Sequence, residues 1–215
     1  MNVYEGWSFS NIETIARAYE SSDPNGDISG RIVQQRYNKI LERVWRPKLE
    51  SGFLSFSKEN PYESCGEMVA DLYERMRLKV WNGANDHPGM PGELNLFFRA
   101  DHDWFGHVGG GHYLSYAHQL PTVHLPEFNV GGECVALIRQ IEHHTQSHKL
   151  SIPDKEAISQ VIVWEILGQL ACEVVNGEFP QQKTLNLSKL RELKILIRDE
   201  NGNDAFEMKH GLRTY

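Results

Sequence analysis

The segment Ile158–Val175 constrains the fold most, because the helix that it predicts is apolar on almost every side. A helix of that kind is buried, so other helices must surround it. Ser151 with Pro153 in the first turn is a typical helix start, and Asn176-Gly177 is a common helix stop. The sequence therefore predicts a helical bundle built around this segment.

Other segments supply the helices that would cover it. Apolar residues recur at helical spacing in three of them, which cover residues 27–49, 94–108 and 133–148. With 215 residues, the chain is long enough for one well-buried domain and does not require a second. We therefore predict a mainly α fold in which residues 1–215 form a single helical domain.

The C-terminal region has a different pattern. Leu193, Ile195 and Ile197 alternate with their neighbours, Asn201-Gly202 is a strong turn signal, and residues 205–209 are placed to pair back. These features predict a small C-terminal β-hairpin beside the helices.

Charge and hydropathy exclude some classes of function. The net charge of −7 argues against a surface for duplex nucleic acid, which requires a basic stripe. No uninterrupted apolar run approaches the 18 or so residues that cross a bilayer, and the N-terminus lacks the features of a signal peptide. We expect a cytoplasmic protein that binds no membrane.

Histidine is distributed unevenly along the chain. Nine of the ten histidines fall between residues 87 and 148, namely His87, His102, His107, His112, His118, His124, His143, His144 and His148. Neutral imidazole is the commonest metal ligand in proteins, so this concentration favours a metal site. The three cysteines are far apart and form no C-x-x-C pair, which argues against a thiolate zinc site.

The segment Leu94–Val108 contains several candidate metal ligands close together in the sequence. If it forms a regular helix ending at the glycines 109–111, Asp103 and His107 share one face, with His102 about 100° away. Such a helix presents imidazole and carboxylate ligands to a pocket. The alternative is a histidine held in the core or at the surface by an aspartate. Residues 113–126 would form a loop or a broken helix over the site, or a loose surface loop.

Two further helices add polar groups. Helical spacing places Glu133, Gln140 and His144 on one stripe and turns His143 away from it, so we select His144 as the inward histidine. Glu165 and Gln169 lie four residues apart inside the apolar helix. A buried carboxylate needs a partner, which is either a metal site or a salt bridge to Arg99 or Arg139.

These stripes predict one metal centre where three helices converge. The absence of paired cysteines and the mixture of histidine and carboxylate favour a catalytic divalent metal, zinc, manganese or iron. The metal ligands that we predict are His102, His107, Glu133 and His144. The residues that we expect to act in catalysis are Asp103, Glu165, Arg99 and Gln169.

Several motifs between about residues 61 and 183 resemble a family of largely uncharacterised proteins encoded by phages and related mobile elements. They are PYESCGEMVADLYERMRLKVW, HP, FRADHDWFGH, GGE, WEILGQ and FPQQK. The resemblance implies that Arg99, His102, Asp103, His107, Glu133, Glu165 and Gln169 form one constellation, and that the protein acts in the host cytoplasm. Two positions depart from the family pattern: Ile166 stands where that pattern has Thr, and Gln140 where it often has His.

The pair His102-Asp103 is also similar to the His-Asp pair of the HD-domain phosphohydrolases, helical enzymes that hold a metal with it. This weaker likeness implies that His87 is an upstream ligand.

The predicted function is that of a hydrolase in which the metal activates water against a phosphate ester, a nucleotide or an amide. Glu165 or Asp103 would move the proton, and Arg99 would steady an anionic substrate or pair with a buried carboxylate. A non-haem iron oxygenase on the same ligands is the competing enzyme hypothesis. A phage-associated binding or structural protein, in which the histidines and carboxylates only fix the fold, is the third.

Overall fold

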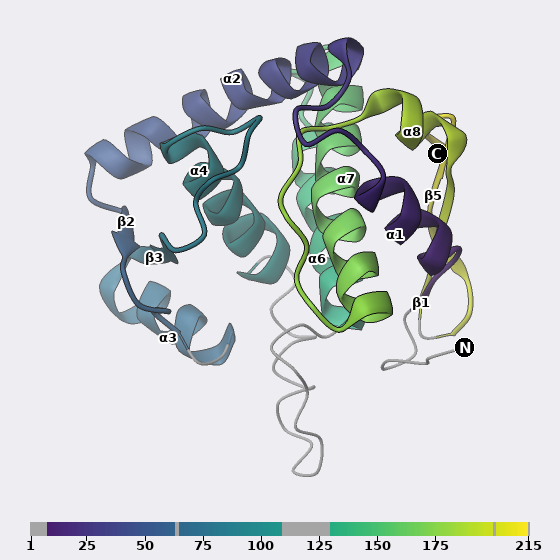
Figure 1. Ribbon diagram of the computed structural model, residues 1–215. Coiled ribbons are helices and arrows are strands. Elements are labelled where there is room, and N and C mark those ends of the chain that lie inside the picture. Colours follow the sequence, from purple (N-terminus) through teal and green to yellow (C-terminus); the bar gives the residue numbers. More distant parts are fainter. Residues whose placement is uncertain (1–7, 63–64, 109–129, 200, 215) are drawn as a thin grey trace.

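The computed structural model describes residues 8–62, 65–108, 130–199 and 201–214. Helix α7 (Ile152–Asn176) lies at the centre beside α6 (Val130–Thr145), with α2 (Ile28–Glu50) crossing near their ends and α1 (Ile12–Glu20) on the other side of α7 (Figure 1). The prediction of a helical fold built around the apolar segment is confirmed.

The boundaries of α7 follow from local chemistry. The side chain of Ser151 accepts a hydrogen bond from the backbone N–H of Asp154, whose carboxylate accepts one from the Ser151 N–H in return. At the other end Gly177 adopts a left-handed conformation with φ 76°, which a glycine reaches without strain. Length and composition would let α7 cross a membrane, but 83% of its apolar window is buried inside the molecule. It is therefore placed as the core helix of a soluble protein would be.

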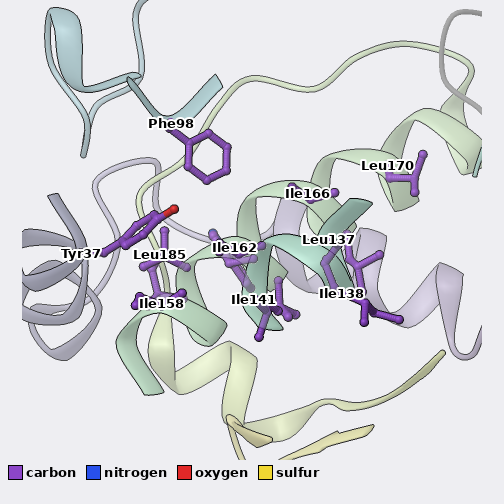
Figure 2. Close-up of a cluster of buried hydrophobic side chains, with 14 of the residues drawn as sticks. Tyr37, Phe98, Leu137, Ile138, Ile141, Ile158, Ile162, Ile166, Leu170 and Leu185 are labelled. Atoms are coloured by element: carbon purple, nitrogen blue, oxygen red, sulfur yellow. The ribbon is translucent and has the colours of Figure 1, made fainter. Parts of the chain in front are cut away.

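The core lies between these helices. Figure 2 shows side chains from α2, α6, α7 and the helix α4 (Glu93–Asp101) meeting there, together with Leu185 from the segment after α7. Trp45, Trp164, Tyr37 and Phe97 are among the largest fully buried side chains. Polar groups inside this core need partners, which is where the candidate site arises.

On one side of the bundle, α4 packs against α2 and a short parallel pair of strands, β2 (Leu54–Ser57) and β3 (Leu78–Trp81). Helix α3 (Cys65–Arg75) continues this side (Figure 1). A loop from Trp81 to Gly92 then leads into α4 and carries His87 into the interior.

On the other side, α8 (Leu187–Glu192) precedes a small antiparallel sheet (Figure 1). Strands β4 (Lys194–Arg198) and β5 (Asp204–Lys209) pair as the predicted hairpin, with the Asn201-Gly202 turn between them. Two strands extend it to the order β1-β4-β5-β6, namely β1 (Ser8–Phe9) and β6 (Leu212–Thr214). The predicted C-terminal hairpin is therefore confirmed and belongs to a larger sheet.

Candidate metal centre

The helix that begins as α4 changes its winding where the candidate ligands start. Residues His102–Val108 form a π-helix, η1, in which backbone hydrogen bonds join residues five apart. In a regular α-helix His102 and His107 would point about 140° apart. In η1 their rings lie edge to face with centroids 4.5 Å apart. The prediction of a regular helix through residue 108 is wrong, because residues 102–108 form a π-helix. Its wider turn brings both imidazoles to one side.

Gly106 allows this turn to approach α6. A Cβ atom on Gly106 would lie 2.9 Å from the backbone oxygen of Ala136 and 3.0 Å from its Cβ. Any other residue would force η1 and α6 apart. The glycine therefore brings the two histidines against the helix that carries Glu133.

The carboxylate of Glu133 contacts the imidazoles of both His102 and His107. Its Oε2 lies 3.0 Å from Nε2 of His102, and its Oε1 lies 3.2 Å from Nε2 of His107. Donor atoms of the three residues all lie within 4.8 Å of one another, so the group could hold a metal ion. Two ligand atoms on one tetrahedral zinc ion are about 3.4 Å apart, given bond lengths near 2.1 Å. The two nitrogen–oxygen separations, 3.0 and 3.2 Å, are near that value.

The exposure of the group is a second observation that fits an ion at this position. The three side chains are 11–15% exposed, so water or a small solute reaches their edge. The residues present therefore suit a bound cation with access from outside.

The charges of the metal-free group are strongly coupled. Burial alone would lower the pKa of His102, but the Glu133 carboxylate raises that pKa to about 9. Burial would raise the pKa of Glu133, but His107 and His102 hold it far below its usual range. The metal-free site is thus an imidazolium paired with a carboxylate, and a divalent cation would replace the proton.

Asp103 lies next to this group. Burial raises the pKa of its carboxyl above the usual range, although the charges on His107 and His102 act in the opposite direction. A carboxyl that retains a proton more readily than an ordinary aspartate suits general acid–base chemistry beside a metal. Its predicted catalytic role stays a prediction.

Asp101 forms the layer behind the ligands. Its Oδ2 lies 2.8 Å from Nε2 of His144 and accepts a 2.8 Å hydrogen bond from Nε2 of Gln140. Burial opposes ionisation of Asp101, but His144, Trp45 and Gln140 hold its pKa below the usual range. Sequence reasoning assigned Asp101 no role. The signal that could have identified Asp101 is its position in the sequence, between the buried Phe98 and the predicted ligand His102.

His144 faces inward as predicted, but it contacts Asp101 instead of the other predicted ligands. It is buried and faces inward, as predicted, while His143 is exposed and stacks on Phe105. Its imidazole nevertheless binds Asp101 and lies outside the group of possible metal ligands, because Asp101 takes its Nε2. In place of the predicted direct contact with the ion, His144 contacts Asp101, which lies behind the possible ligands.

Glu165 and Gln169 form a separate buried network. Oε1 of Glu165 lies 2.9 Å from Nε2 of His87, and Gln169 donates a 2.6 Å hydrogen bond to Oε2. Nδ1 of His87 accepts from the backbone N–H groups of Gly89 and Met90, each at 2.9 Å. The expected convergence of Glu165 on the same ion is not found, and its partner is neither Arg99 nor Arg139. His87 likewise lies outside the group.

Arg99 binds backbone oxygens. Its guanidinium donates hydrogen bonds of 2.7–2.9 Å to the carbonyls of Trp81, Gly83 and Ala84, and it stacks over the Trp81 ring. These bonds hold the loop before α4 against the helix. Its predicted contact with substrate stays a prediction. The loop predicted over the site, at residues 113–126, lies outside the described residues.

No protein-family model, no curated protein and no solved structure matches the chain. The resemblances to the phage-encoded family and to the HD-domain enzymes therefore remain predictions, and the case for function rests on the geometry of the site.

Proposed function

We propose that this protein is a metal-dependent hydrolase whose divalent cation is held by His102, His107 and Glu133. The observation that carries the proposal is the convergence of two Nε2 atoms on one carboxylate, at 3.0 and 3.2 Å. Three protein ligands with an edge open to solvent are typical of a catalytic metal site, whereas structural zinc sites have four protein ligands.

A cation bound there would lower the pKa of a bound water toward neutrality and so supply a hydroxide nucleophile. Glu133 and the two imidazoles would hold the cation and orient its open side. Asp103 would then accept and return a proton beside the reacting water, because burial keeps its carboxyl easier to protonate. The substrate classes that we propose are phosphate esters, nucleotides and amides.

The ligand types also support a second candidate. Two histidines and one carboxylate are the set used by non-haem iron oxygenases, which leave the remaining positions for substrate and oxygen. Zinc or manganese in the purified protein would favour the hydrolase. Iron together with turnover that requires oxygen would favour the oxygenase.

The test begins with elemental analysis of protein purified without an affinity tag, which should contain about one equivalent of metal. Hydrolysis of model phosphodiesters, nucleotides and amides is then measured without oxygen. Asp103→Asn should retain the metal and lose at least about 100-fold in turnover. Asp86→Asn, on the exposed loop before α4, is the matched control and should change neither.

Protein that contains no metal, and whose biological activity survives chelators, would overturn the proposal. That result would leave the binding or structural function, for a phage-type protein in the cytoplasm, as the remaining hypothesis.

A further inference from the structure

The carboxylate of Asp101 is fully buried and surrounded by hydrogen-bond donors. Oδ1 accepts from the indole N–H of Trp45 at 2.7 Å. Oδ2 accepts from Gln140 Nε2 at 2.8 Å and from the hydroxyl of Tyr37 at 3.1 Å, and His144 lies 2.8 Å away. Because an ionised carboxylate only accepts, every group that faces it must donate.

This requirement fixes the orientation of the Gln140 amide. The NH₂ end must face Asp101, so the carbonyl Oε1 faces the other way, toward Nδ1 of His102 at 3.1 Å. A carbonyl oxygen accepts only, so Nδ1 of His102 must carry a hydrogen. When a cation displaces the proton between Nε2 and Glu133, this hydrogen stays on Nδ1, and Nε2 is the nitrogen with a free lone pair. Nε2 is the atom that faces Glu133.

We propose that Asp101 and Gln140 are positioning residues that hold His102 in the tautomer whose Nε2 binds the cation. The proposal rests on the metal site proposed above. Histidine ligands of metals are commonly oriented by an acceptor on the second ring nitrogen, and loss of that acceptor weakens metal binding about 10–100-fold. Here the acceptor is an amide whose direction is set by a buried carboxylate.

Trp45 makes the role of Asp101 testable with an isosteric change. In Asp101→Asn, the indole N–H of Trp45 still needs an acceptor, so the Asn carbonyl must take the Oδ1 position. The Asn NH₂ then faces Gln140, so the Gln140 amide must rotate to present its carbonyl oxygen to the Asn. The amide NH₂ now faces Nδ1 of His102, which must accept, so the hydrogen moves to Nε2 and blocks the cation.

The double variant Asp101→Asn, Gln140→Glu should restore binding. A carboxylate at position 140 accepts from the Asn NH₂ on one side and from Nδ1–H of His102 on the other. The net charge and the volume of the pair are those of the native protein. Rescue by this pair would show that hydrogen-bond direction is what matters, because a defect in packing would persist.

The experiment titrates each protein with Zn²⁺ against a chromophoric chelator. Asp101→Asn should bind zinc about 10–100-fold more weakly, and the double variant should return to within about threefold of the native affinity. Gln140→Met removes the acceptor without changing Asp101 and should lose as much as Asp101→Asn. Arg139→Gln is the control, because Arg139 stands next to Gln140 on α6 and its side chain is 54% exposed.

The ring nitrogens are examined in parallel by ¹⁵N NMR. A hydrogen-bonded Nδ1–H signal from His102 is expected in the native protein and the double variant, with and without zinc, and should be absent in Asp101→Asn. Native affinity in folded Asp101→Asn or Gln140→Met, or failure of the double variant to recover, would overturn the proposal. Absence of zinc binding by the native protein would overturn the metal site instead, and the Nδ1–H signal of the metal-free protein would still show whether Nδ1 of His102 donates to Gln140.

Discussion

Two buried clusters in this protein use the same residue types in different ways. His102, His107 and Glu133 direct two imidazole nitrogens at one carboxylate, and their side chains are 11–15% exposed. His87 pairs with Glu165 at 2.9 Å, and both side chains are at most 1% exposed. One cluster is open at its edge and the other is sealed.

The hydrogen bonds of the two clusters also differ. Nδ1 of His87 accepts from two backbone N–H groups, so both of its ring nitrogens have partners. Nδ1 of His107 is buried without a partner among the described residues. A sealed pair whose ring nitrogens both have partners is an architectural element, whereas a partly exposed group of three donors is suited to a ligand. Access to solvent therefore discriminates between the clusters, and residue type does not.

The largest effect is expected in the sealed cluster. His87→Ala removes the partner of Glu165 and leaves a buried charge, which should lower the free energy of unfolding by about 3–5 kcal/mol. Urea denaturation in the presence of a chelator measures this loss. Zinc affinity of the folded variant should stay within about twofold of native. A loss of affinity as large as that of a ligand variant would remove the distinction between the clusters.

The open cluster should respond in the opposite way. His107→Ala should weaken zinc binding at least about 100-fold, or about 2.8 kcal/mol. The stability of its metal-free form should fall by less than that of His87→Ala, because the His107 side chain is 15% exposed and already has an unpaired nitrogen. Competition titration and urea denaturation provide the two numbers. His143→Ala, at an exposed histidine stacked on Phe105, is the control and should keep native affinity.

The link between the open cluster and its neighbours is tested at Gly106. Gly106→Ala places a Cβ 2.9 Å from a backbone oxygen of α6, so η1 must shift and stability should fall by about 1–3 kcal/mol. Zinc affinity should fall as well, because the shift separates His102 from Glu133. Unchanged thermal stability and affinity would show that the close approach of η1 to α6 is not required.

A change of pH should act on the open cluster in two opposite directions. The pKa of His102 is raised to about 9 in the folded, metal-free protein, above its unfolded value near 6.5. Its contribution to stability is therefore complete below pH 6.5 and is lost as pH rises through 9. Zinc affinity should instead rise by up to about tenfold per pH unit over this window, because zinc displaces the proton. Denaturation and titration at pH 6, 7, 8 and 9 would measure both slopes, and slopes of the same sign would contradict the ion-pair description.

Local sequence signals predicted most of the fold. The Ser151 cap and the Gly177 stop define α7, and Asn201-Gly202 defines the hairpin, because each depends on a few neighbouring residues. Helical spacing likewise placed Glu133 and Gln140 on one face, and both contact His102.

The remaining features depend on contacts between distant segments. The π-helix forms where Gly106 meets α6, thirty residues later in the chain, and no local pattern marks that contact. The partner of Glu165 is His87, 78 residues earlier, on a loop whose path is set by the whole bundle. Sequence spacing identified these side chains as polar groups in apolar surroundings, but it could not determine which of them meet.

The wide turn of η1 also has an evolutionary consequence. His102 and His107 are separated by four residues, whereas regular helices that bind metals place their two histidines with three residues between them. Loss of one codon, for example that of Trp104, would convert one spacing into the other and turn the π-helix into an ordinary one. The site is thus a single deletion away from the histidine spacing of the H-E-x-x-H motif, and searches that assume that spacing pass over it.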